Sequence, residues 1–247
     1  MPELNGTASV ADAIALTMRS YFSINHLATA AHQAQVAARI EAAYGGFNAG
    51  EAVEHKGAVS GSIFMSVAGV EASINEFFSD CADAHMYHLV GLEEQAVDRL
   101  ARGWNATSIV EKASILEKFQ FACLLADKAP LDLGTPAAQD LAIGIDIRNA
   151  LMHYKPQSVD LPLDGTSVTV VGSWKSIERK LKGRPKLTPN PFASEAQPEF
   201  PYRVLGYECA KRTLSGALSF LELFASHLGL TRPPFQNICS ELRAGRK

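Results

Sequence analysis

The sequence predicts an all-α fold, a bundle of long helices followed by an irregular insertion. No proline lies between Pro2 and Pro130, which leaves room for long uninterrupted helices. Apolar residues recur in this part of the chain at steps of three, four and seven, as they do along one face of a helix. Seven of the 12 prolines fall within residues 156–201. We therefore expect one helical domain over residues 1–247 that carries an insertion at 156–201.

Composition places the chain among ordinary globular proteins and excludes several classes. Of its 247 residues 47% are hydrophobic and 20% are charged, which excludes wholesale disorder, collagen and disulfide scaffolds. The net charge of −3 excludes a polycation, so any contact with nucleic acid must come from a local patch. The four cysteines form no C-x-x-C pair, and no run of 18 apolar residues occurs. These features predict a cytoplasmic protein with reduced thiols, no membrane span and no cofactor.

Three helices are expected in the first half of the chain. Ser9 suits the N-cap of a helix that continues to Tyr44, where a Gly-Gly pair ends it. Apolar residues at helical spacing mark a second helix around residues 63–77. A third is expected over about 85–102, with Gly91 as a weak point.

The second half contains clearer helix boundaries. An S-x-x-E capping box at residues 108–111 predicts the start of a fourth helix. The dipeptide Thr135-Pro136 supplies an N-cap followed by proline at the first helical position, and this fifth helix is expected to end at about Tyr154. Leucines at helical spacing over residues 214–228 mark the last helix.

The insertion holds two features of interest. Apolar residues alternate on both sides of Asp164-Gly165, over 159–163 and 168–170, which is the pattern of a short β-hairpin. Further along, Trp174 precedes a run of six basic residues: Lys175, Arg179, Lys180, Lys182, Arg184 and Lys186. One interpretation is a patch that binds RNA phosphates, with Trp174 stacking on a base. The other is a solvated, mobile basic loop.

The most informative segment lies near the end of the fifth predicted helix. Asn149 and His153 are i,i+4 neighbours there, and Arg148 flanks them. Arginine binds a phosphate oxygen and stabilises charge that develops on it. Histidine titrates near neutral pH and moves protons to and from ribose oxygens, while the amide orients either partner. This set suits cleavage of RNA without a metal, because the 2′-hydroxyl of the substrate is itself the attacking group.

This segment resembles the HEPN superfamily, whose R-x4-6-H signature stands here as Arg148-Asn149-x3-His153. The resemblance implies a helical bundle with the motif near the end of a late helix. It also implies a metal-independent endoribonuclease of toxin–antitoxin or anti-phage systems, with RNA as substrate and a site formed between two copies of the chain. An antitoxin or regulatory protein is a further implied partner. Some members of the superfamily look non-catalytic, so a nucleotide-binding, RNA-binding or scaffold protein is the alternative.

Two details limit the resemblance. Arg19 and His26 also satisfy the loose signature, but serine follows Arg19 and nothing ends the expected helix there. In one HEPN subgroup a tyrosine two positions after the histidine is modified by a partner enzyme. Here Tyr154 follows the histidine directly and Lys155 occupies that position.

Two other clusters have functional and structural interpretations. Glu71 and Asn75 are i,i+4 neighbours among apolar residues, where they either orient Arg148 from a neighbouring helix or form a buried polar tie between helices. Cys81, His85 and His88 fall at i, i+4 and i+7 on one helical face, where they could hold zinc. No clear fourth ligand exists, so a histidine-rich surface is the favoured interpretation and no metal is expected.

Overall fold

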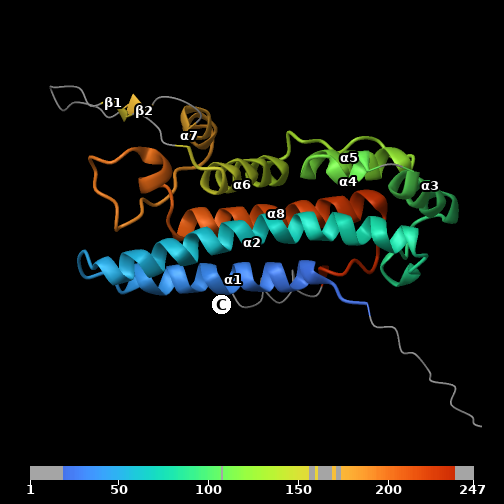
Figure 1. The fold of residues 1–247 in the computed structure, drawn as a ribbon, viewed down its shortest axis with the longest axis horizontal. Coiled ribbons are helices and arrows are strands. Elements are labelled where there is room, and N and C mark those ends of the chain that lie inside the picture. Colours follow the sequence, from blue (N-terminus) through green and yellow to red (C-terminus); the bar gives the residue numbers. More distant parts are fainter. Residues whose placement is uncertain (1–18, 107, 156–158, 161–168, 171–173, 237–247) are drawn as a thin grey trace, which may run out of the picture.

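Three long helices run side by side along the long axis of the molecule (Figure 1): α1 (Phe22–Ala42), α2 (Ala49–Ala82) and α8 (Tyr207–Leu228). This arrangement comes from a computed structural model. It describes residues 19–106, 108–155, 159–160, 169–170 and 174–236. The predicted all-α class is confirmed in these residues.

The shorter helices form a second layer and close the two ends of the bundle (Figure 1). Over α2 and α8 lie α4 (Ile109–Lys112), α5 (Ile115–Leu125) and α6 (Pro136–Met152). One end carries the 3-10 turn η1 (Met86–His88) and α3 (Glu94–Ala106). At the other end lie α7 (Trp174–Lys182) and the irregular turn η2 (Glu199–Arg203).

Two clusters of buried side chains hold these layers together. The larger joins α1–α6 and α8 and contains Phe78, Phe119 and Phe220, all inaccessible to solvent. The smaller joins α1, α2, α6, α7, η2 and α8 and contains Ile147 and Phe200. Because Ile147 belongs to the second cluster, the C-terminal end of α6 is anchored in the core.

The first two helices differ in length from the prediction. Among described residues α1 begins at Phe22 and not near residue 10, because residues 19–21 are extended; the expected start at Ser9 lies outside the described part. Helix α2 begins well before its apolar pattern, at Ala49. There the Asn48 side chain accepts the backbone N–H groups of Gly50 and Glu51 and so caps the helix.

The third predicted helix is wrong over its first turns. Residues 86–88 form η1 and the helix proper starts at Glu94. Gly91 adopts a φ of 113°, and a Cβ built on it would lie 1.9 Å from the carbonyl oxygen of Gly229. The close approach of this loop to the end of α8 therefore requires glycine and excludes a helix here.

The fourth predicted helix is in fact two. The Ser108 side chain caps nothing, and α4 is a single turn. The working capping box lies six residues later, where the Ser114 backbone N–H donates to the Glu117 carboxylate at 2.9 Å and opens α5. Burial favours this start, because it places Ile115 and Phe119 in the core.

Helix α6 follows the prediction closely and packs against α8 at close range. Thr135 caps it by accepting the Ala138 N–H at 3.4 Å, and the helix ends at Met152, two residues before the predicted end. A Cβ added to Gly144 would lie 2.5 Å from the methyl group of Thr213 in α8. This contact leaves no room for a side chain and fixes the position of α6 on the bundle.

The insertion is more regular than the sequence indicates. Residues 174–182 form helix α7 and not an irregular loop, with Trp174, Ile177 and Leu181 buried on one face. The described residues also include a two-residue antiparallel pairing of β1 (Val159–Asp160) with β2 (Thr169–Val170). The Asp-Gly turn lies outside the described residues, so the hairpin remains a prediction.

Helix α2 is long and apolar enough to cross a membrane by length and composition alone. The core helix of a soluble protein passes the same test. In this fold α2 lies at the centre of the bundle, in contact with α1, α3, α5, α6 and α8. Its apolar character is therefore accounted for by the protein core.

Candidate functional site

The end of α6 carries the arginine, asparagine and histidine of the predicted motif in two different environments. Arg148 is half-buried, whereas Asn149 and His153 are exposed. His153 is the C-cap of the helix, and its backbone N–H donates to the carbonyl oxygen of Asn149 at 2.9 Å. Among the described residues no side-chain hydrogen bond joins the three. They share one helix end, and two of their side chains are open to solvent.

Arg148 reaches across to α2 and meets a carboxylate. One of its terminal nitrogens lies 3.6 Å from an oxygen of Glu71, and the arginine and glutamate side chains are 21% and 41% exposed. The same glutamate lies 3.8 Å from the ammonium group of Lys118 in α5. The predicted contact of Glu71 with Arg148 is thus present in the structure.

Asn75 forms a polar tie between helices, which is the structural interpretation of this pair and not the contact with Arg148. Its side-chain oxygen accepts a hydrogen bond from Lys118 at 2.9 Å, so it holds the lysine and makes no contact with Arg148. Lys118 is only 2% exposed, which is unusual for a lysine and explains the need for polar partners. Sequence reasoning missed this residue. Its position between Ile115 and Ala122, on the apolar face of α5, is the signal that would have found it.

Charge at this junction favours an anionic ligand. Two cations, Arg148 and Lys118, share the single carboxylate of Glu71, which leaves one positive charge in excess. Because Arg148 and Glu71 are partly exposed, a phosphate oxygen approaching from solvent can meet the guanidinium directly. The arrangement therefore suits a phosphate group at Arg148.

Trp174 cannot serve as the base-stacking residue that the sequence suggests. It is 4% exposed and packs against Phe200 with ring centroids 5.6 Å apart and against Tyr154 at 5.8 Å. Both contacts place the indole in the core beneath α7. Its role in this structure is to anchor that helix to the end of α6.

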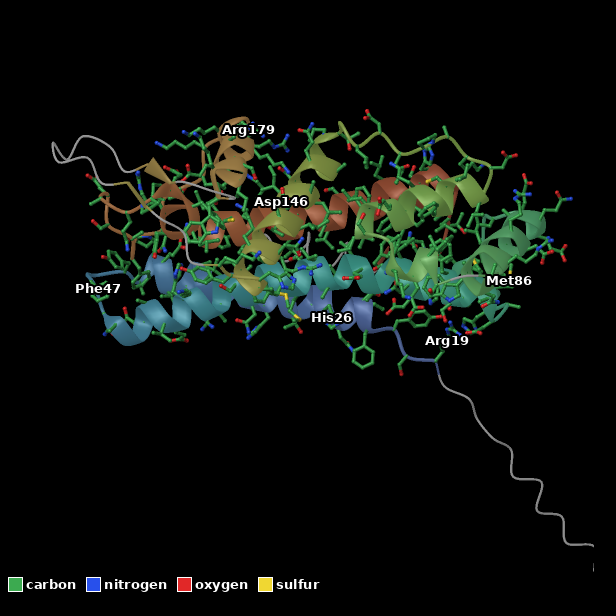
Figure 2. All side chains as sticks on the ribbon, turned by 45° about the horizontal axis from the view of Figure 1, so that its top comes forward. Arg19, His26, Phe47, Met86, Asp146 and Arg179 are labelled. Carbon is green, nitrogen blue, oxygen red and sulfur yellow. The ribbon has the colours of Figure 1, made fainter. Side chains whose placement is uncertain are left out.

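The basic run divides into two groups. Lys180 pairs with Asp146, and Arg184 donates to Asp140 at 2.6 Å, so both fasten α7 and the residues after it to α6. Figure 2 shows Asp146 and Arg179 on the same side of the bundle. Lys175, Arg179, Lys182 and Lys186 are exposed to solvent, and Lys180 is exposed as well although it pairs with Asp146. The mobile-loop interpretation is wrong for residues 174–182, because they form a packed helix.

The zinc hypothesis fails on geometry. Helix α2 ends at Ala82 and Ala84 has a positive φ of 53°, so Cys81 does not share a helical face with the two histidines that follow. Burial raises the pKa of the Cys81 thiol to about 12, which opposes the thiolate that zinc needs. His88 is bonded to the backbone oxygen of Arg232 at 2.8 Å. No group of three potential metal ligands exists within the described residues.

The second match to the loose signature has a structural role. Arg19 precedes α1, and its guanidinium lies 2.8 Å from Asp80 and 2.6 Å from Asp83 at the end of α2. Figure 2 shows Arg19 at the same end of the bundle as Met86 and far from Asp146. Arg19 thus fastens the chain that leads into α1 and lies remote from the end of α6.

Comparisons with protein-family models, curated proteins and solved structures find no match to this chain. An assignment of function therefore rests on the geometry at the end of α6 and on the motif that it carries.

Proposed function

We propose that this protein is a metal-independent endoribonuclease of the HEPN type that acts in the cytoplasm as a homodimer, in a toxin–antitoxin or anti-phage role. One observation carries the proposal. The half-buried Arg148, held by Glu71, stands at the same helix end as the exposed side chains of Asn149 and His153. A fixed cation and a solvent-open imidazole at one helix end are the groups that phosphodiester cleavage needs.

The chemistry follows from the charges that develop on the substrate. The 2′-hydroxyl of one ribose attacks the adjacent phosphorus, loses its proton to a histidine, and the bond to the 5′-oxygen breaks. The leaving oxygen takes a proton from a second histidine, which gives 2′,3′-cyclic phosphate and 5′-hydroxyl ends. Arg148 stabilises the extra negative charge on the non-bridging oxygens, and Asn149 orients the phosphate or the ring.

A second copy of the chain supplies the second histidine. Each chain has one set of Arg148, Asn149 and His153, whereas the reaction moves protons at two oxygens. A two-fold dimer that brings two α6 ends together places the same residues on both sides of the phosphate. We therefore expect a dimer by light scattering at tens of micromolar, and a protein that stays monomeric would contradict the composite site.

The alternative is a HEPN-like binding or scaffold protein without catalysis. A pure scaffold has no need for a solvent-open imidazole, and its His153 would be expected to pack among apolar residues, whereas a binding protein needs the ring open as the nuclease does and is distinguished from it by the cleavage assay. His153 is exposed. This observation favours the nuclease over the scaffold.

Cleavage of a labelled RNA by purified protein tests the proposal. Arg148→Ala and His153→Ala should each lower turnover by at least about a hundredfold, the scale of a general acid–base group. Combined, the two losses should not add, because both groups serve one transition state. His26→Ala is the matched control, since this histidine belongs to the loose motif on α1 and should leave activity unchanged.

Two further conditions separate this mechanism from others. Activity should persist in EDTA, and an all-DNA strand should remain intact because it lacks the 2′-hydroxyl. A His153→Ala protein that melts at the wild-type temperature and cuts RNA at the wild-type rate would show the proposal to be wrong. Loss of activity in EDTA would point instead to a metal.

A further inference from the structure

A pocket of about 480 Å³ lies beside the end of α6. Its walls come from α2, from Leu151 and Tyr154 at the end of α6, and from the segment 190–205. We infer that this pocket holds one nucleobase of the RNA strand, next to the phosphate that is cut. The inference rests on the proposed function and adds to it a site that binds a base.

The chemistry of the walls selects a flat aromatic ligand. Four aromatic side chains line the pocket: Phe64, Tyr154, Phe192 and Tyr202. The two tyrosines are exposed, so their rings are available to a ligand. Stacking of a base on an aromatic side chain is worth roughly 1–3 kcal/mol and tolerates every base, because each has a π face. The volume falls within the range of about 300–1,000 Å³ found for small-molecule sites.

The aromatic wall is held in place before any ligand arrives. The Phe192 ring lies 4.9 Å from the ring of Tyr44 and 4.9 Å from that of His55. His55 is buried and bonded to the Glu41 carboxylate at 2.7 Å, and the same oxygen accepts the Tyr207 N–H at 2.6 Å. A wall fixed by these contacts loses little conformational entropy when a ligand binds.

The pocket and the charged junction lie along one face of α2. Lys56, Ser60 and Phe64 follow each other at i,i+4 and line the pocket, and Glu71 comes two turns later, about 10 Å along the axis. Lys56 places an exposed ammonium group at the rim, where a neighbouring phosphate of the strand would pass. One strand can thus reach His153 with its phosphate and the pocket with the adjoining base.

Binding of 2′-O-methyl RNA tests the inference without cleavage, because these strands lack the attacking hydroxyl. We compare a short homopolymer with the same strand made abasic at one internal position, by fluorescence anisotropy. Tyr202→Ala removes one stacking face, and Ser60→Phe fills the pocket without removing a core side chain. Each should lower the affinity for the base-bearing strand by at least about fivefold, the lower bound of one stacking contact.

The difference in affinity between the intact and the abasic strand distinguishes loss of base binding from general destabilisation of the protein. Wild type should bind the abasic strand less tightly than the intact strand, and this difference should shrink in both variants. Tyr87→Ala is the matched control, because this exposed tyrosine belongs to η1, next to Met86 at the opposite end of the bundle (Figure 2), and the variant should keep the full difference.

The outcomes separate this inference from the nuclease proposal. Three results would refute the base pocket, whatever the cleavage assay shows. These are that wild type does not bind the strand, that it binds intact and abasic strands equally, or that Ser60→Phe binds like wild type. If the variants lose the base-dependent affinity but wild type never cuts RNA, the pocket stands and the nuclease proposal falls. Base-dependent binding together with His153-dependent cleavage supports both.

Discussion

Replacing Glu71 by glutamine keeps the size of the side chain and removes its charge. In the native protein this carboxylate lies 3.6 Å from the guanidinium of Arg148 and 3.8 Å from the ammonium of Lys118. It therefore does two things at once. It orients the arginine, and it competes with any phosphate that approaches the same cation.

The Coulomb energy bounds the size of the effect. Two unit charges 3.6 Å apart attract by about 1.2 kcal/mol in water and by about 4.6 kcal/mol at an effective dielectric constant of 20. Because Glu71 is 41% exposed and Arg148 is 21% exposed, the lower end applies. A change of about 1 kcal/mol corresponds to roughly a fivefold change in affinity.

Affinity for RNA and turnover should therefore change in opposite directions in Glu71→Gln, so that KM and kcat both fall. RNA should bind roughly fivefold more tightly, because the competing carboxylate charge is gone, and this gain should shrink as salt is raised. Turnover should fall by roughly tenfold, because the guanidinium loses the group that orients it, equivalent to about 1.4 kcal/mol in the barrier. Cleavage kinetics at several salt concentrations measure both quantities.

Glu111→Gln is the matched control. It makes the same change of charge at an exposed position on α4, and it should alter neither constant. If Glu71→Gln behaves like this control in both KM and kcat, then the contact with Arg148 has no role in binding or catalysis. A fall in affinity for Glu71→Gln would contradict the electrostatic argument directly.

The remaining predictions concern the fold and the basic face of α7. Gly91→Ala should lower the free energy of unfolding by at least about 2 kcal/mol, because its Cβ would lie 1.9 Å from a backbone oxygen. This loss corresponds to a drop in Tm of at least about 4 °C. In the control Gly57→Ala the new methyl group lies in open space on a helix, and Tm should rise slightly. Burial raises the pKa values of three thiols, to about 12, about 11 and about 12 in Cys81, Cys123 and Cys209. In a Cys239→Ser background they should react with a thiol reagent at pH 8 only after denaturation, and rapid native labelling would contradict this. Neutralising Lys175, Arg179 and Lys182 together should weaken RNA binding and make it less dependent on salt, without changing turnover at saturating RNA. Unchanged binding would show that these side chains do not contact RNA.

Capping residues and apolar spacing predicted those helices whose boundaries depend on residues nearby in the sequence. Thr135 followed by proline predicted the start of α6, and helical spacing placed Arg148, Asn149 and His153 at its end. Contacts across the fold could not be predicted in this way. The apolar spacing of α5 indicates that Lys118 is buried, but no property of its immediate neighbours indicates that the side-chain oxygen of Asn75 accepts its hydrogen bond.

Helix α7 was not predicted because its sequence contains features of both a helix and a loop. Trp174, Ile177 and Leu181 have the spacing of a buried helical face, but the surrounding prolines and the basic charges favour an irregular loop. Burial of that apolar face decides the structure, and the charges are accommodated on the opposite side. The same burial removes Trp174 from any role in contacting RNA.

The close contact of α6 with α8 has a consequence for how this protein can change over evolution. Gly144 leaves no space for a side chain against Thr213, so the anchoring face of α6 tolerates little variation. The residues at the tip, Asn149 and His153, point to solvent and carry none of that packing. Substitutions at the tip therefore leave the packing of the core unchanged. An activity there can be gained, modified or lost during evolution without compensating changes in the rest of the protein.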